Sequence, residues 1–215
     1  MPVDTNIALT TYATVKSELD LSDDTKQTYL ERQINVISQK IADYCNRKFK
    51  KQTYTLEKYQ GTDTLELNLK NYPVTDPITA LVIDDATVDL DYVTVDSDEG
   101  ILYYESIFTK NGWVTSITET LTLPERNISV TYEAGYDLPD QVTPTLPYDL
   151  EEACINEVVE AYNKKGKAKS QNLESWTLDK ATKKFSSVEK VIDTETGFLL
   201  STKSLLDSKY KRWII

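Results

Sequence analysis

Apolar residues recur every three or four positions between residues 11 and 47, which is the spacing of one face of an α-helix. The pattern predicts a short helix over residues 11–19, capped by Thr10 or Thr11, and a long helix that begins after Ser22 and ends near Arg47. Asp23 and Asp24 would lie in the first turn of the long helix, where the helix dipole favours acidic side chains. The apolar stripe of this helix consists of Leu30, Ile34, Ile37, Ile41, Tyr44 and Cys45.

From about residue 52 to residue 133 the pattern changes to alternation of polar and apolar positions, which is typical of strands with one buried face. Residues that form turns separate the alternating stretches, for example residues 60–63, 84–85, 98–100 and 111–112. Short strands at this spacing predict an antiparallel sandwich or a small barrel. The strands are expected over residues 53–56, 65–69, 80–83, 92–95, 101–104 and 128–132.

The helical spacing returns after a connector with three prolines at residues 137–147. It predicts a helix over residues 148–165 that Gly166 ends. The apolar stripe of this helix consists of Leu150, Cys154, Val158, Ala161 and Tyr162. Residues 167–200 have no clear period, and we expect an extended arm with one or two hairpins. Ser201 is expected to cap a final short helix that reaches about Lys211.

Together these elements predict an α+β fold. Two N-terminal helices and the later long helix form a small helical bundle, an antiparallel β-sandwich or barrel segment is inserted between them, and an extended C-terminal arm ends in a short helix. The chain is expected to divide into a helical part (residues 1–50), a β subdomain (51–136), a connector with the third bundle helix (137–166), and the arm with its short helix and tail (167–215).

The composition limits the catalytic and ligand-binding chemistry that the protein can perform. The 215 residues include no histidine, which excludes the imidazole bases and the common zinc motifs. The six glycines form no phosphate-binding loop. Residues 96–100 resemble part of an EF-hand loop, but Ile107 stands where the loop needs its last glutamate, so a solvated acidic loop is expected. We therefore expect no catalytic residue, no bound metal and no cofactor, and a protein that is not an enzyme.

The two cysteines and the N-terminus bear on where the protein works. Met1 to Asp4 lack the features of a signal peptide, and no apolar run approaches the roughly 20 residues that span a bilayer. We expect assembly in the host cytoplasm and no membrane contact. Cys45 and Cys154 both lie on apolar stripes, so reduced and buried thiols are expected, either apart or against each other.

Charge is distributed unevenly along the chain. Residues 1–160 carry 12 Lys/Arg and 29 Asp/Glu, whereas residues 161–215 carry 12 Lys/Arg and 6 Asp/Glu. The acidic body argues against general nucleic-acid binding, because phosphates repel it. An acidic body with a basic tail suggests head-to-tail association of identical copies, although a solvated basic tail explains the same distribution. The basic run at residues 164–169 fits the end of a helix better than a nucleic-acid site, because it lacks interleaved aromatic residues.

Three short patterns resemble the head–tail connector (adaptor) family of long-tailed double-stranded DNA phages. The first is the opening from Thr11 to Lys16, followed by Leu19, an acidic gap and the long helix. The second is the end of that helix over residues 41–49, which is close to the family's I-x-x-Y-C/T-x-R-x-F. The third is the stretch over residues 130–136, followed by residues 147–153. Asn46 departs from the glycine of many relatives, but asparagine also tolerates left-handed backbone geometry.

The resemblance covers most of residues 8–165 and the last fifteen residues, but not the arm at 167–200. It implies a structural virion protein of the neck, a ring of about twelve copies under the portal that extends the DNA channel and docks the next neck or tail component. The implied partners are the portal protein, further copies of the chain, a downstream neck or tail protein, and DNA that passes without specific binding. The partner-binding candidates are Lys209, Tyr210, Lys211, Arg212, Trp213, Ile214 and Ile215, a basic and apolar tail that we expect to stand free of the chain's own core.

Two other functions stay open on the sequence. One is a different neck or tail-completion protein, which would form a ring with other partners. The other is a carbohydrate-binding or adhesion module, in which Trp113, Tyr92, Tyr103 and Tyr104 would stack on sugars.

Overall fold

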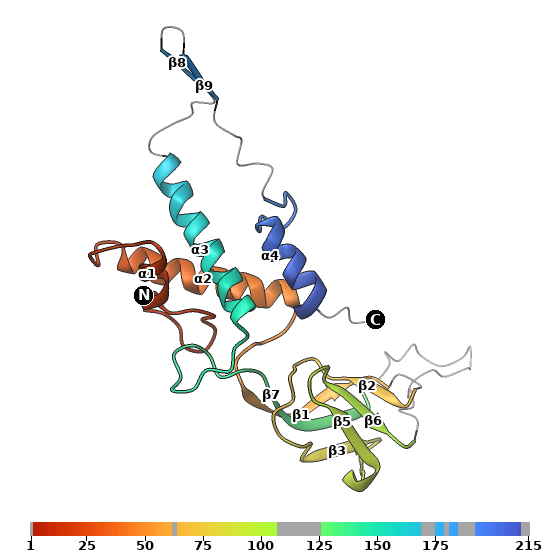
Figure 1. Ribbon diagram of the computed structural model, residues 1–215. Helices are drawn as coiled ribbons and strands as arrows, with labels where there is room; N and C mark the ends of the chain where they lie inside the picture. The colour runs from red at the N-terminus through yellow and green to blue at the C-terminus, as the bar shows by residue number, and fades with distance from the viewer. Residues whose placement is uncertain are drawn as a thin grey trace, which may run out of the picture. The chain divides into compact units, whose positions relative to one another are not determined.

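The computed structural model describes residues 2–61, 64–106, 126–168, 175–178, 181–184 and 192–211. The chain forms two compact units, one of Met1–Arg47 with Leu138–Ile215 and one of Lys48–Asp137. The first unit holds the helices and the second holds two antiparallel sheets (Figure 1). This α+β architecture, with a β segment inserted into a helical one, confirms the predicted fold class.

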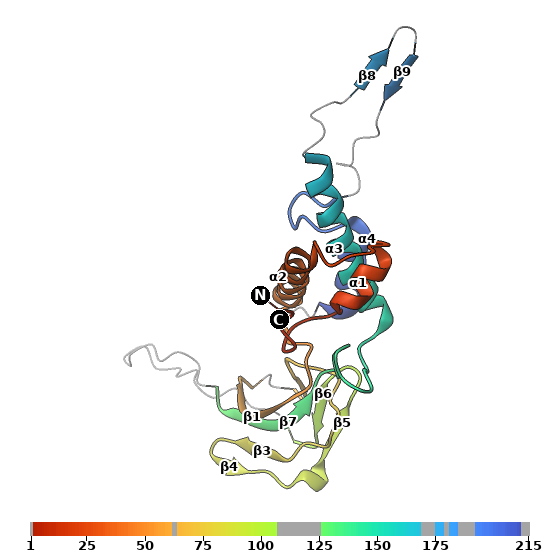
Figure 2. The ribbon, with the colours of Figure 1, turned by 90° about the vertical axis from the view of Figure 1, so that its left-hand side faces the viewer.

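The helical unit contains α1 (Tyr12–Glu18), α2 (Gln27–Cys45), α3 (Tyr148–Ala168), α4 (Leu200–Leu205) and a π-helical turn, η3 (Leu206–Tyr210). Figure 2 shows α2 end-on with α3 and α1 beside it. Most of the residues on the predicted stripes are buried: Leu30, Ile34, Ile37, Ile41 and Cys45 on α2, and Leu150, Cys154 and Val158 on α3. Tyr44, Ala161 and Tyr162, which belong to the same predicted stripes, are only half-buried.

Local signals set the ends of some helices but not of others. Thr11 caps α1, because its Oγ1 accepts a hydrogen bond from the backbone N–H of Thr14. Asn46 ends α2 in the left-handed conformation (φ 53°), as the resemblance to glycine-containing relatives indicated. The predicted start of α2 is wrong, since Asp23 instead accepts hydrogen bonds from Thr25 in a turn before the helix. Two further predictions are wrong: Gly166 lies inside α3, and Leu199 rather than Ser201 precedes α4.

Buried polar contacts join α2 to α3. The Ser38 hydroxyl lies 3.6 Å from the Cys154 sulfur and accepts a hydrogen bond from the backbone N–H of Leu9. Both cysteines are free and buried, which confirms the prediction. Burial raises the pKa of each thiol to about 12, because the thiolate would lose its hydration there.

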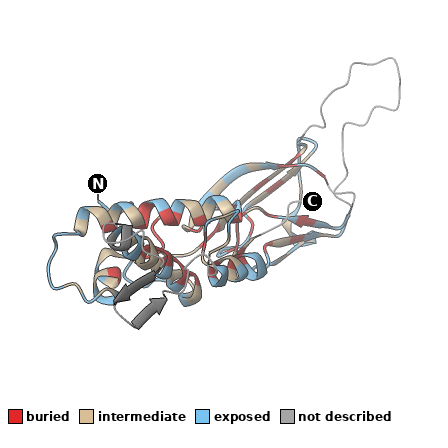
Figure 3. Cartoon of the chain, turned by 90° about the horizontal axis from the view of Figure 1, so that it is seen from above, coloured by how far each residue is buried: buried red, intermediate tan, exposed pale blue. Residues whose placement is uncertain are grey.

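The β unit is a sandwich of two sheets. One sheet has the order β1 (Gln52–Tyr59), β7 (Ile128–Ala134), β3 (Ala80–Ile83), β4 (Ala86–Thr87); the other has the order β2 (Glu66–Asn68), β6 (Ile101–Tyr104), β5 (Val93–Asp96). All six predicted strands are present, and the two-residue strand β4 is additional. Both sheets contribute side chains to one core: Tyr59, Leu67, Leu69, Val74, Ile78, Leu81, Leu102, Ile128, Val130, Tyr132 and Ala134. Figure 3 colours the buried residues red, and they occur in both units.

Two features make this sandwich specific. Gly135 has a φ of 113°, and a Cβ there would lie 2.6 Å from the carbonyl oxygen of Lys50, so only glycine fits. At the edge of the core, the half-buried Glu57 carboxylate accepts hydrogen bonds from the hydroxyls of Tyr59 (2.5 Å) and Tyr132 (2.6 Å). The ammonium of Lys70 lies 3.7 Å from the same carboxylate, so the two buried hydroxyls and the carboxylate all have partners.

The arm after α3 contains one antiparallel hairpin, β8 (Ser175–Leu178) with β9 (Ala181–Lys184). This agrees with the expected hairpin. The division of the chain at residues 50, 136 and 166 stays a prediction, although the boundaries of the β unit lie close to the first two.

Candidate interaction site

The C-terminal segment is attached to the first turn of α3 through one carboxylate, that of Asp149. The Lys209 ammonium lies 2.5 Å from Asp149 Oδ2, and the Tyr210 hydroxyl donates to Oδ1 over 2.5 Å. Burial raises the pKa of Asp149, but the hydrogen bonds from Lys209 and Tyr210 outweigh it, and the pKa is lowered overall. The carboxylate therefore stays charged and holds the end of η3 in place.

Lys211 marks where the chain leaves this anchor. Its backbone N–H donates to the carbonyl of Leu206, and its ammonium lies 4.1 Å from the centroid of the Tyr44 ring. Its backbone is extended (φ −84°, ψ 121°), so the helical path ends there. Tyr44 also donates to Asp207 over 2.6 Å, and burial together with this bond raises its pKa to about 12.

A second anchor fixes the start of α4. The backbone N–H of Leu199 donates to the buried Glu157 carboxylate of α3 over 2.7 Å. Shortly before Leu199, the Asp193 carboxylate accepts hydrogen bonds from Thr196 and forms an ion pair with Lys203 (3.1 Å). Together these contacts lower the pKa of Asp193 to about 2. The terminal helix is thus tied to α3 at both of its ends.

The surface next to the Asp149 anchor is exposed and partly apolar. Tyr148, the residue before Asp149, is 88% exposed, and Val142 in the connector is 99% exposed. The Lys209 side chain is 59% exposed despite its ion pair. Exposed aromatic and basic groups next to one another are typical of contact surfaces. We call Tyr148, Lys209 and the half-buried Lys211, whose ammonium lies 3.9 Å from the Asp207 carboxylate, the exit surface.

The structure divides the predicted partner-binding segment. Lys209 and Lys211 lie on the exit surface, whereas Tyr210 is buried in the helical unit. The expectation that all of residues 209–215 stand free of the chain's own core is therefore wrong for Tyr210. Arg212, Trp213, Ile214 and Ile215 lie outside the described residues. Sequence reasoning missed Asp149 and Glu157, whose only signal was an acidic side chain next to an apolar stripe.

The other candidate chemistries gain no support from the geometry. Among the described residues, no group of three acidic or cysteine side chains could hold a metal ion, and the Asp96 carboxylate instead accepts a hydrogen bond from the backbone of Glu99. Tyr103 and Tyr92 are exposed, but Tyr104 packs against the β core. Trp113, the proposed centre of a sugar platform, lies outside the described residues.

The basic run at the end of α3 is engaged with the helical unit where it is described. Lys164 lies 4.0 Å from Glu160, and the Lys165 ammonium lies 3.6 Å from the centroid of the Tyr29 ring. In the described parts of the chain, no helix has the length and apolar character to cross a bilayer.

Comparison with known proteins places this architecture in a family. A family model described as "Head completion protein" matches residues 8–194. A chain from the "Neck of empty GTA particle computed with C6 symmetry" is similar in structure, with a TM-score of 0.48 and 14% identity, over 94% of this chain and 90% of that one. Another, from the "Neck of native GTA particle computed with C12 symmetry", has a TM-score of 0.41 and 14% identity, over 100% of this chain and 98% of that one. No curated protein matches the sequence significantly.

Because the family model covers most of the sequence, the chain belongs to the head completion protein family. It is a structural protein of head completion, which confirms the class that the sequence resemblance indicated. The match also extends to residue 194, through most of the arm that the sequence patterns left unassigned.

Proposed function

We propose that this protein is a head–tail connector that forms a closed ring of about twelve copies beneath the portal. The ring would extend the DNA channel and present a platform for the next neck or tail component. It would be made in the host cytoplasm and joined to the filled head there. The observation that carries the proposal is the match to the head completion family over residues 8–194.

The distribution of charge supports a ring through which DNA moves. The β unit, residues 48–137, carries 7 Lys/Arg and 16 Asp/Glu. Acidic surfaces repel phosphates, so a channel wall of this composition would let DNA slide without binding it. A closed ring also needs a heterologous interface, in which two different patches of one subunit complement each other. An acidic unit and a basic tail provide such a pair.

The exit surface and the residues beyond it are the proposed contact with partners. Lys209 keeps a basic charge at the surface, Lys211 lies half-buried beside Asp207 where the described chain ends, and the anchors at Asp149 and Glu157 hold the segment in a fixed position. Such preorganisation lowers the entropic cost of binding. We propose that Lys209, Lys211 and residues 212–215 contact the portal or the adjacent subunit, with Tyr210 as their internal anchor. The mechanism is assembly and requires no catalytic group.

Mixing the purified chain with the portal protein of the same phage tests the function. Electron microscopy of the purified mixture should show rings of this chain on the narrow end of the portal, and a chain ended at Lys211 should form fewer of them. The truncated chain can be compared directly with the full chain, because truncation after Lys211 keeps Tyr210 and both anchors. Binding to a tail-completion protein but not to the portal would instead indicate the other neck function.

A further inference from the structure

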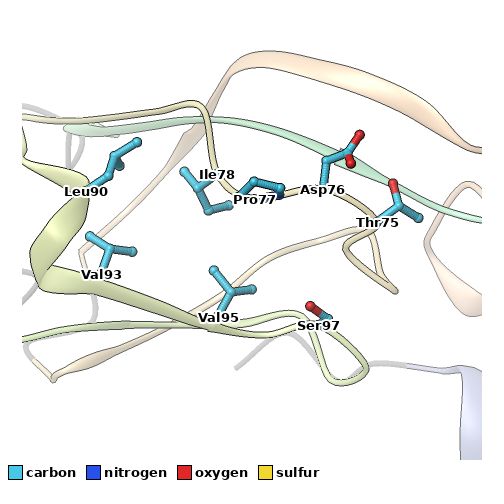
Figure 4. Close-up of a pocket in the computed structure, with 8 residues that line it drawn as sticks. All are labelled: Thr75, Asp76, Pro77, Ile78, Leu90, Val93, Val95 and Ser97. Carbon is cyan, nitrogen blue, oxygen red and sulfur yellow. The ribbon is translucent and has the colours of Figure 1, made fainter.

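The β unit contains an apolar pocket of roughly 430 Å³ at an open edge of the sandwich. Figure 4 shows Val93 and Val95 pointing from β5 toward Ile78 and Pro77 on the segment that leads into β3, with Leu90 closing one end. Val93, Val95 and Leu90 are only partly buried against the core. Among the described strands, β5 is the edge of its sheet. The core of the sandwich is therefore accessible from outside at this edge.

The rim of the pocket is polar and negatively charged. Asp76, Thr75 and Ser97 line the end opposite Leu90, and all three are exposed. Residues 84–99, which include β5, contain seven acidic residues and no lysine or arginine. Lys51, which does not line the pocket, is paired with Glu133 at 3.1 Å. The pocket thus combines an apolar floor with an acidic rim, and its ligand should be apolar and basic.

The tail of the same chain has this composition. Beyond the extended Lys211, the sequence continues with Arg212, Trp213, Ile214 and Ile215. In an extended segment, alternate side chains point to opposite sides. Bound as an extended strand, the segment would place Trp213 and Ile215 on one side and Arg212 on the other. Along β5 the alternation is the same, with Val93 and Val95 toward the pocket and Asp96 on the outer face.

We propose that residues 212–215 of a second copy bind along β5, with Trp213 in the apolar pocket and Arg212 beside Asp96. The inference rests on the proposed ring, and it names the two patches that such a ring requires. Main-chain hydrogen bonds to the edge strand and a pocket for every second side chain are a known mode of peptide recognition. Burial of a tryptophan supplies the largest single contact that this tail can make.

A synthetic peptide of residues 208–215 tests the site directly. Fluorescence anisotropy should show that the peptide binds the full chain and binds the chain ended at Lys211 at least as tightly. Val93→Lys places a charge in the apolar floor and should weaken binding at least tenfold. Thr94→Lys adds the same charge on the outer face of the same strand and should change binding less than threefold. A peptide with Trp213→Ala should bind at least tenfold more weakly, and higher salt should weaken binding of the unaltered peptide.

A mixing experiment identifies the occupant as a second copy. The chain ended at Lys211 keeps only the pocket, and Val93→Lys keeps only the tail. Sedimentation should show each variant as a monomer and the mixture as a 1:1 dimer that grows no further. Circular dichroism and melting establish that both variants are folded.

Three results would overturn the inference. One is equal binding of the peptide to Val93→Lys and to the unaltered chain, and another is no binding at all. The third is a peptide that binds only the truncated chain while the mixture stays monomeric, because the chain's own tail would then fill the pocket. Since none of these measurements contains portal protein, a negative result here leaves the portal test of the connector function standing.

Discussion

The carboxylate of Glu157 accepts a hydrogen bond from the backbone N–H of Leu199 over 2.7 Å, so a buried acid of α3 takes the place of a helix cap for α4. α4 has no side-chain cap of its own. Because the N–H that precedes α4 bonds to a side chain 42 positions earlier in the sequence, the stability of α4 depends on the packing of the bundle.

Glu157→Ala should therefore destabilise the helical unit. The change leaves the Leu199 N–H without its acceptor and opens a small cavity, with an expected loss of about 1–3 kcal/mol in the free energy of unfolding. Urea denaturation followed by circular dichroism measures it. Glu152→Ala, on the exposed side of the same helix, is the control and should cost less than about 0.5 kcal/mol. Similar losses for both variants would show that the hydrogen bond contributes nothing specific.

Asp149→Asn should release the C-terminal anchor without unfolding the unit. The neutral amide loses the ion pair with Lys209 and the charged acceptor for Tyr210, so trypsin should cut after Lys209 several times faster than in the unaltered chain. Asp140→Asn, in the exposed connector, is the matched control. Unchanged cleavage in Asp149→Asn would mean that burial of Tyr210 alone holds the segment.

The same anchor should respond to acid. The pKa of Asp149 is lower in the folded chain than its ordinary value of 3.8, so the stabilisation from this contact is complete above that value. It is lost as the pH falls through the lower, folded-state pKa. Acid proteolysis with pepsin between pH 4 and pH 2 should first cut near Tyr210, and Asp149→Asn should remove this pH dependence. An identical pH profile in the variant would assign the acid response to another carboxylate.

The core tyrosines should resist ionisation until the β unit unfolds. Burial, followed by the contact between the two phenols and the hydrogen bonds to Glu57, raises the pKa of Tyr59; burial and the bond to Glu57 raise that of Tyr132. Since both folded-state values lie above the unfolded value near 10, their contribution to stability is complete below pH 10 and is lost as the pH rises above it. Ultraviolet titration should show these phenols ionising together with loss of the β signal. Reversible ionisation of all tyrosines in the folded protein would contradict this.

Thiol labelling should distinguish the folded from the unfolded chain. Cys45 and Cys154 are 1% and 0% exposed and have raised pKa values, so a maleimide reagent should react slowly in native buffer and completely in denaturant. Ser38→Ala, which removes the hydroxyl beside Cys154, should leave labelling of Cys45 unchanged. Rapid native labelling of both thiols would mean that α2 and α3 separate readily.

Periodicity was sufficient for the elements and their buried faces, because burial imposes its spacing on every helix and strand. The positions of Ile34, Cys154 and Val130 in the core follow directly from it. The pairing of the strands did not follow from periodicity. The order β1-β7-β3 joins strands far apart in sequence, and alternation defines a strand's faces but not its neighbours.

The wrong boundaries have a common cause. Asp23 accepts hydrogen bonds from Thr25 in a turn, and the N–H before α4 bonds to Glu157 rather than to Ser201, so in both cases other contacts outweighed local propensity. Gly166 lies inside a helix that continues past it. The tail anchor is similar, because Asp149 and Tyr210 are 61 positions apart and nothing local relates them. The pocket beside β5 could not be predicted either, since it depends on the distance between β5 and the segment that leads into β3.

The base of the β unit has a consequence for how such proteins diversify. The entering and leaving strands are joined there, since Tyr136 donates to the carbonyl of Phe49 and accepts from the backbone N–H of Lys51. An insert whose two ends lie side by side can be shortened, lengthened or exchanged while its host closes the gap with a short loop. The β unit can therefore change in length or in sequence while the helical unit keeps its fold.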